Sequence, residues 1–147
     1  MIDPQELRIG VNVMRESLFQ PSYTRGTILY DFITVERHDI YACGTSPKSF
    51  MPIVITGDIL VSMGLHKDNY GIYVLTTDGQ YNSKSVNDIV LKEMVVEGET
   101  SWDCHISDSH LIFGGTPFSV IKHVHELQNI YYDRHKKRLI CKDPAKI

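Results

Sequence analysis

The stretch TPFSVIKHVHELQNIY, residues 116–131, decides which fold the sequence predicts. Its apolar side chains recur at the three- and four-residue spacing of one helix face: Val120, Val124, Leu127 and Tyr131. A helix with such a face buries it against another element. Thr116 is suited to cap the helix, and Pro117 to its first turn, where the missing N–H costs nothing. We therefore expect a long helix within 116–140 that packs on a sheet through Leu127.

The first third of the chain predicts strands. Apolar and polar residues alternate from Leu7 to Val13, which is typical of a half-buried strand. Residues 27–36 (TILYDFITVE) are rich in β-branched and aromatic side chains and are expected to form the longest strand. A turn at 37–39 and a short strand at 40–43 follow. Three strands with short links predict an antiparallel meander or a small SH3-like barrel.

A short helix is expected between strands in the middle of the chain. Thr56 has a side chain suited to an N-cap, and Gly64 is suited to end a helix. These two signals delimit a helix over 57–63. Further strands are expected at 53–55, 71–75, 101–106 and 111–113, with turns at 77–79 and 97–99. Residues 84–97 favour a strand because 89–96 are rich in β-branched residues, and the alternative is a helix that starts from a capping box at 85–88. The predicted fold class is α+β.

The composition is that of an ordinary globular domain. The 147 residues are 42% hydrophobic and 22% charged, which excludes a disordered chain, a coiled coil and collagen. A chain of this length can bury one core of its own. We expect a single domain over 1–147. Its parts are an N-terminal strand meander (1–52), a middle helix with strands (53–115), a C-terminal helix (116–140) and a basic tail (141–147).

Charge is distributed unevenly along the chain. The net charge is −3, yet residues 133–147 hold six basic and two acidic side chains, so the remainder is acidic. Opposite charges on one chain suit a symmetric contact in which each basic segment meets the acidic body of a second copy. We therefore expect a homo-oligomer, most simply a dimer. At this net charge nucleic acid is not expected as a partner.

The cellular location is predicted from segments that the sequence lacks. Residues 1–6 have neither the basic nor the apolar region of a signal peptide, and no apolar run is long enough to span a bilayer. Cys43, Cys104 and Cys141 are an odd number of cysteines without a CxxC pair, which is typical of reduced thiols. We expect a protein of the cytoplasm of a bacterial host, without membrane association.

Three blocks of sequence occur in a recognisable order. They are ELRIGVNV (6–13), PIVIT (52–56) followed by MGL (63–65), and IKHVHELQNIY (121–131). In this order they resemble a family of small uncharacterised proteins from Bacteroidetes genomes, prophages and phages. That family has ELRIGN near its start, a proline-led IxLT…L…GF segment, and KYVHxLQNLY in its last helix. The resemblance implies an accessory protein of a phage or mobile element and no particular chemistry.

Two departures from this family pattern are visible. Val11 and Asn12 stand where the family has Asn followed by an apolar or aromatic residue, and His123 replaces the usual Tyr of the helix motif.

The histidines do not have the spacing of metal ligands. There is no HExxH and no CxxC, which are the patterns typical of zinc sites. His123 and His125 lie two residues apart in the expected helix and so point in nearly opposite directions, which prevents them from chelating one ion together. We expect no metal and no other cofactor, so elemental analysis of the purified protein should find no stoichiometric metal.

A few residues are candidates for binding a ligand. His125 and Gln128 share a helix face, and with Asn129 they could recognise a nucleotide base or phosphate. The alternative is that these side chains hydrogen-bond the backbone of a neighbouring strand, because buried polar groups need partners. Tyr23 and Arg25 could stack on a base, and the helix start at Thr116 could bind an anion.

No catalytic motif is present. There is no GxSxG, and residues 114–117 (GGTP) lack the Lys of a P-loop. We therefore expect a non-catalytic binding protein of a phage or mobile element, which sequesters a nucleotide signal or a host defence protein. Two alternatives are a small hydrolase or nuclease that uses His105, His110 or His125, and a nucleic-acid-binding adaptor with an SH3-like barrel.

Overall fold

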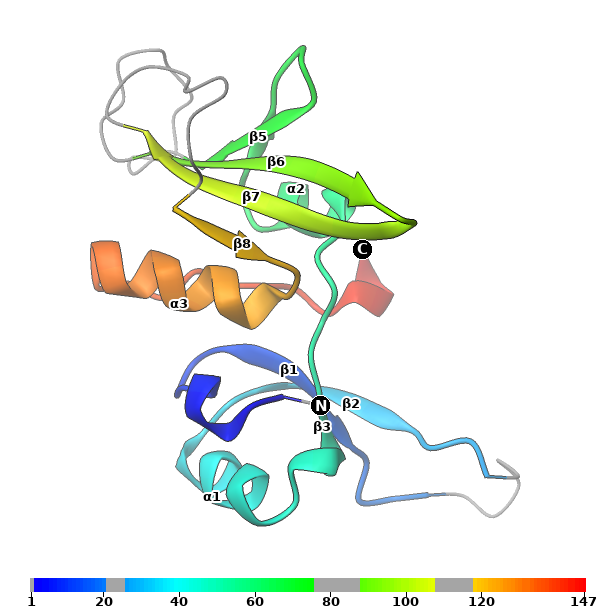
Figure 1. Ribbon diagram of the computed structural model, residues 1–147. Coiled ribbons are helices and arrows are strands. Elements are labelled where there is room, and N and C mark those ends of the chain that lie inside the picture. Colours follow the sequence, from blue (N-terminus) through cyan, green and yellow to red (C-terminus); the bar gives the residue numbers. More distant parts are fainter. Residues whose placement is uncertain (1, 21–25, 76–87, 108–117) are drawn as a thin grey trace. The chain divides into compact units, whose positions relative to one another are not determined.

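The computed structural model describes residues 2–20, 26–75, 88–107 and 118–147. It divides into two compact units, each described here by itself (Figure 1). Unit 1 comprises Met1–Val54 and His123–Asp143, and unit 2 comprises Ile55–Lys122 and Pro144–Ile147. The fold is α+β, with one antiparallel sheet in each unit.

Unit 1 is a three-stranded sheet with a helix on each face. Its elements are η1 (Pro4–Glu6), β1 (Asn12–Glu16), β2 (Tyr30–Thr34), α1 (Arg37–Thr45), η3 (Pro47–Ser49), β3 (Phe50–Met51) and α3 (Val124–His135). The strand order is β2-β1-β3, so β1 is central. In Figure 1 the sheet lies between α1 and α3.

The two faces of β1 bury different chemistry. Val11 and Val13 belong to an apolar cluster that also contains Cys43 of α1. Asn12, between them, points to the opposite face of the sheet and is hydrogen-bonded to Gln128 of α3. The alternation that predicts a strand thus also determines which residues meet α1 and which meet α3.

Unit 2 is an antiparallel meander with one short helix. Its elements are α2 (Gly57–Ser62), β4 (His66–Lys67), β5 (Ile72–Leu75), β6 (Asp88–Val96), β7 (Glu99–Ser107), β8 (Ser119–Ile121) and η4 (Pro144–Lys146). The strands follow one another in chain order across the sheet. The Tyr73 ring meets Trp102 edge-on, with ring centroids 5.5 Å apart. Gly57 begins α2 against the Tyr73 hydroxyl, where a Cβ would overlap it.

Several predictions for unit 2 are confirmed. α2 begins after Thr56, whose hydroxyl accepts a hydrogen bond from Ile59 N at 3.2 Å, and Gly64 follows it with φ +100°. The strands expected at 71–75 and 101–106 are β5 and β7, and β6 occupies the described part of 84–97. The turn at 97–99 has positive φ at Glu97 and Gly98, as in a tight hairpin. The turn at 77–79 and the strand at 111–113 lie outside the described residues.

The N-terminal strands differ from the prediction. The strand expected at 7–13 begins only at Asn12, because Gly10 adopts φ +92° and leaves Ile9 half exposed. The strand expected at 27–36 is five residues long, whereas β6 and β7 have nine each. β3 pairs with β1 instead of continuing a meander, and the strand expected at 53–55 is a single bridge at Val54.

The turn and strand predicted over 37–43 are wrong, because this segment is the helix α1. Asp39 accepts a hydrogen bond from Glu36 N at 2.9 Å, which is half of a capping box. The prediction takes residues 37–39 as a turn into a strand at 40–43 and does not use the Asp39 carboxylate as a capping signal.

The predicted start of the long helix is also wrong. Residues 119–121 form β8, which pairs with Trp102–Cys104, and Val120 is 54% exposed on it. α3 begins at Val124, with His123 as its N-cap. The expected packing of this helix on a sheet is confirmed, since Val124 and Leu127 are fully buried and α3 lies along β1. No helix among the described residues is long and apolar enough to cross a bilayer.

Two Ala substitutions, of Leu127 and of Val120, test where the helix begins. Leu127→Ala removes a fully buried side chain and should lower the free energy of unfolding by about 2–5 kcal/mol. Val120→Ala, on the exposed strand, should change it by less than about 0.5 kcal/mol. Urea denaturation of the two variants measures both values, and equal losses would contradict the observed helix start.

Candidate functional site

A pocket opens in unit 1 at the N-terminus of α3. It encloses about 270 Å³ and is lined by Ile2, Asp3, Glu6, Pro52, His123, His125 and Glu126. These residues come from η1 and its flank, from the end of β3 and from the first turn of α3. Five of the seven lining residues are histidines or carboxylates, so the pocket is a candidate functional site.

The first turn of α3 positions one histidine and one carboxylate. His123 has extended backbone angles, and its N–H donates to Glu126 Oε1 at 3.1 Å. The same carboxylate oxygen lies 3.0 Å from His123 Nδ1. A carboxylate in this place also suits the positive end of the helix dipole. Glu126 therefore both caps α3 and orients the His123 ring.

The second histidine is buried and held by η1. The His125 side chain is 1% exposed, and its Nε2 lies 3.2 Å from Glu6 Oε2. Its other ring nitrogen, Nδ1, is buried without a hydrogen-bond partner among the described residues. Buried polar atoms are usually paired, so an unpaired one requires an explanation.

The two imidazoles stack on each other. The ring centroids of His123 and His125 are 5.7 Å apart and the ring planes differ by 9°. The expectation that they point in opposite directions is wrong, because it placed both residues in a helix whereas His123 precedes it. Burial lowers the pKa of His123 below its ordinary value, against the opposing effect of the Glu126 carboxylate.

Gln128 and Asn129 hydrogen-bond the protein itself. Gln128 is fully buried: its Oε1 accepts from Asn12 N at 2.7 Å, and its Nε2 donates to Asn12 Oδ1 and Leu139 O. Asn129 Nδ2 donates to Glu6 O at 2.8 Å. The bond from Asn12 N of β1 is the contact with a strand backbone that the alternative predicts, the other partners are a side chain or lie outside strands, and neither Gln128 nor Asn129 lines the pocket.

Of the six residues predicted to bind a ligand, only His125 lines the pocket. Tyr23, Arg25 and Thr116 lie outside the described residues. Asp3, Glu6 and Glu126 were missed. Asp3 precedes Pro4 as a capping residue, and Glu126 follows His123 by three residues as in a capping box, so local capping signals could have found both.

The pocket offers acid–base groups but no hydroxyl, thiol or amine. None of its lining residues is Ser, Thr, Cys or Lys, so carboxylates and imidazoles are the only groups there that could act as nucleophiles. Of the histidines named for a hydrolase, His105 lies in β7 of unit 2, His125 lies in unit 1, and His110 is outside the described residues. Among the described residues no group of three His, Cys, Asp or Glu is placed to hold a metal ion, and the absence of metal stays a prediction.

A second pocket in unit 1, of about 210 Å³, contains an arginine that is already paired. Arg15 lies 2.8 Å from Asp39 Oδ1 and sits over the Phe50 ring, 5.6 Å from its centroid. The guanidinium charge there is balanced within the fold. The pocket at α3 is therefore the stronger candidate.

Comparison of the chain with protein-family models, curated proteins and solved structures gives no match.

The hydrogen bonds of Gln128 predict a large effect of its replacement. Gln128→Leu leaves Asn12 N, Asn12 Oδ1 and Leu139 O without this partner, and should lower the free energy of unfolding by about 3–5 kcal/mol. Asn129→Ala removes one more exposed hydrogen bond and should cost about 0.5–1.5 kcal/mol. Thermal and urea unfolding of the two variants measure both losses. A larger loss of stability in Asn129→Ala than in Gln128→Leu would contradict the prediction.

The thiols predict an alkaline limit to stability. Burial raises the pKa of Cys104 to about 12 and that of Cys141 to about 11. Their stabilising contribution is complete below the pKa of an unfolded thiol, about 8.5, and is lost as the pH rises towards the folded values. We expect iodoacetamide at pH 8 to modify Cys104 and Cys141 only in urea. Rapid modification of both in the native protein, seen by mass spectrometry, would be inconsistent with this burial.

Proposed function

We propose that this protein is a non-catalytic binding protein and that the pocket at the N-terminus of α3 is its ligand site. The proposal rests on one observation: His125, in the wall of an acidic pocket, is buried with one ring nitrogen unpaired among the described residues. The resemblance described above supports an accessory role for a phage or mobile element, in the cytoplasm of a bacterial host.

Binding is favoured over catalysis by the pocket's composition. None of the lining residues supplies a hydroxyl, thiol or amine nucleophile. His123 and His125 are each held by a carboxylate through a ring nitrogen, which fixes both rings in the wall of the pocket.

The charge of the pocket discriminates between the two expected ligands. Asp3, Glu6 and Glu126 line it, and no Lys or Arg does. A nucleotide phosphate would be repelled by these carboxylates. We therefore favour capture of a host defence protein over sequestration of a nucleotide signal.

A thermal-shift screen tests this function. The panel contains cyclic and linear nucleotides, amines and short peptides, and mass spectrometry examines each compound after incubation. We expect a compound that raises the melting temperature to be recovered intact, and to lose its effect in His123→Trp, in which the indole fills part of the pocket. Conversion of the compound would contradict a non-catalytic role, and an unchanged shift in His123→Trp would contradict the site.

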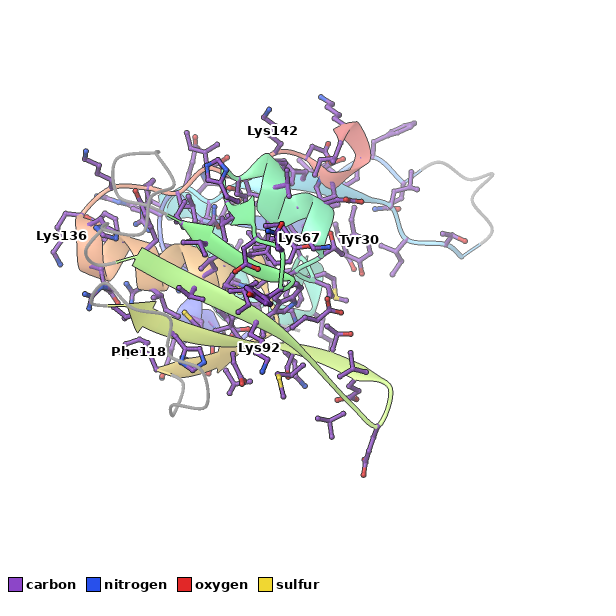
Figure 2. All side chains as sticks on the ribbon, turned by 90° about the horizontal axis from the view of Figure 1, so that it is seen from above. Tyr30, Lys67, Lys92, Phe118, Lys136 and Lys142 are labelled. Carbon is purple, nitrogen blue, oxygen red and sulfur yellow. The ribbon has the colours of Figure 1, made fainter. Side chains whose placement is uncertain are left out.

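We also propose that the protein forms a homodimer through its basic C-terminal segment. Lys136 lies at the end of α3 (Figure 2), and Lys136 and Lys137 are exposed. Leu139 and Cys141 are buried in unit 1, so shortening the chain at Asp133 would remove core residues as well as charge.

Charge substitution is therefore the sharper test of assembly. We expect a dimeric mass for the wild type by light scattering at tens of micromolar, and weaker association for the double variant Lys136→Gln, Lys137→Gln, because rim charges steer and orient a contact. Lys48→Gln, on η3, is the matched control. A monomeric wild type would remove the dimer, and an unchanged dimer in the double variant would remove the role of these lysines.

A further inference from the structure

The walls of the pocket at α3 present hydrogen-bond acceptors and negative charge. Its three carboxylates, from Asp3, Glu6 and Glu126, face no Lys or Arg among the lining residues. Resting on the proposed function, we propose that the pocket binds a positively charged nitrogen group, and that this group is the guanidinium or ammonium of a basic side chain on the captured protein.

The carboxylates of Asp3 and Glu6 keep capacity for such a donor. Asp3 Oδ1 accepts from Gln5 N at 3.0 Å, and Glu6 Oε2 is 3.2 Å from His125 Nε2. A carboxylate accepts about four hydrogen bonds in all. The Glu6 side chain is also 52% exposed, so its charge can be reached from solvent.

The buried histidine adds a further acceptor. In the tautomer that donates from Nε2 to Glu6, the unpaired Nδ1 of His125 carries a lone pair. A ligand N–H would supply the missing partner after a rotation of the ring that exposes Nδ1 to the pocket. In this neutral tautomer an anion or a carbonyl oxygen could not do so.

The helix N-terminus does not reverse this preference. Helix N-termini bind anions through free backbone N–H groups. In α3 two of the first three are used within unit 1: Val124 N donates to Ile53 O at 2.9 Å, and Glu126 N donates to His123 O at 3.1 Å. The dipole is moreover matched by the Glu126 carboxylate.

The size and apolar part of the pocket fit a single side chain. Its volume of about 270 Å³ is below the range of about 300–1,000 Å³ that drug-sized ligands occupy. Ile2 and Pro52 contribute apolar surface, against which the methylene stem of a Lys or Arg can pack while its charged end meets the carboxylates.

A peptide titration followed by NMR tests the proposal. The probes are a short neutral peptide with one central Arg, the same peptide with citrulline, which is nearly isosteric and uncharged, and agmatine as a free small cation. We expect the Arg peptide to bind and the citrulline peptide not to bind. Stronger binding of agmatine than of the Arg peptide would instead identify a free amine as the ligand and overturn the side-chain assignment.

Matched variants locate the binding. Glu6→Gln keeps the shape of the side chain and removes one charge, and should weaken the Arg peptide about tenfold. Glu93→Gln, on the exposed part of β6 in unit 2, is the control and should have no effect. Circular dichroism confirms that both variants fold.

The outcomes separate this proposal from the proposed function. Equal binding of the Arg and citrulline peptides that is lost in His123→Trp would overturn the cationic ligand and keep the pocket as the site. Binding of the Arg peptide that survives both His123→Trp and Glu6→Gln would overturn the site itself. No binding of any of the three probes would overturn the cationic ligand, while the thermal-shift panel still decides on the function.

Discussion

The hydrogen-bonded pair of Asn12 and Gln128 is the constraint on which unit 1 depends. The two amide side chains bond each other, and Gln128 also bonds the backbone of β1 and of Leu139, all in a dry environment. A buried amide is stabilising only when its partners are in place, and it costs free energy when they are not. The pair therefore specifies one position of α3 along β1, whereas a purely apolar contact would allow the helix to slide.

That position determines the geometry of the pocket. With α3 fixed at Gln128, the first turn of the helix lies beside η1, where His125 reaches Glu6 and Asn129 reaches the Glu6 carbonyl. Three polar side chains of α3 thus divide into a satisfied one, Gln128, and two that each keep one unsatisfied buried atom, His125 Nδ1 and Asn129 Oδ1. Gln128 has a structural role, and His125, which lines the pocket, marks where a ligand could add a contact.

The sequence predicts those elements whose ends are signalled locally. α2 is delimited by Thr56 and Gly64, and both residues act as expected. α1 was missed, because its capping residue Asp39 stands in a segment with a high strand propensity. The start of α3 was misplaced because Val120 has helical spacing by coincidence, and only its pairing with β7 shows that it lies in a strand. Of the site, His125 was foreseen and Glu6 was not, since their contact joins residues 119 positions apart.

The path of the chain between the units has a consequence for how such a protein can be built. Unit 1 is interrupted after Val54 and resumes at His123, and these two residues are directly paired as antiparallel neighbours. Antiparallel neighbours are the pairs that a two-residue turn can join. Residues 55–122 are therefore an insertion whose entry and exit lie side by side. A chain in which a tight turn replaces them would keep Asn12, Gln128 and the lining of the pocket, all of which belong to unit 1.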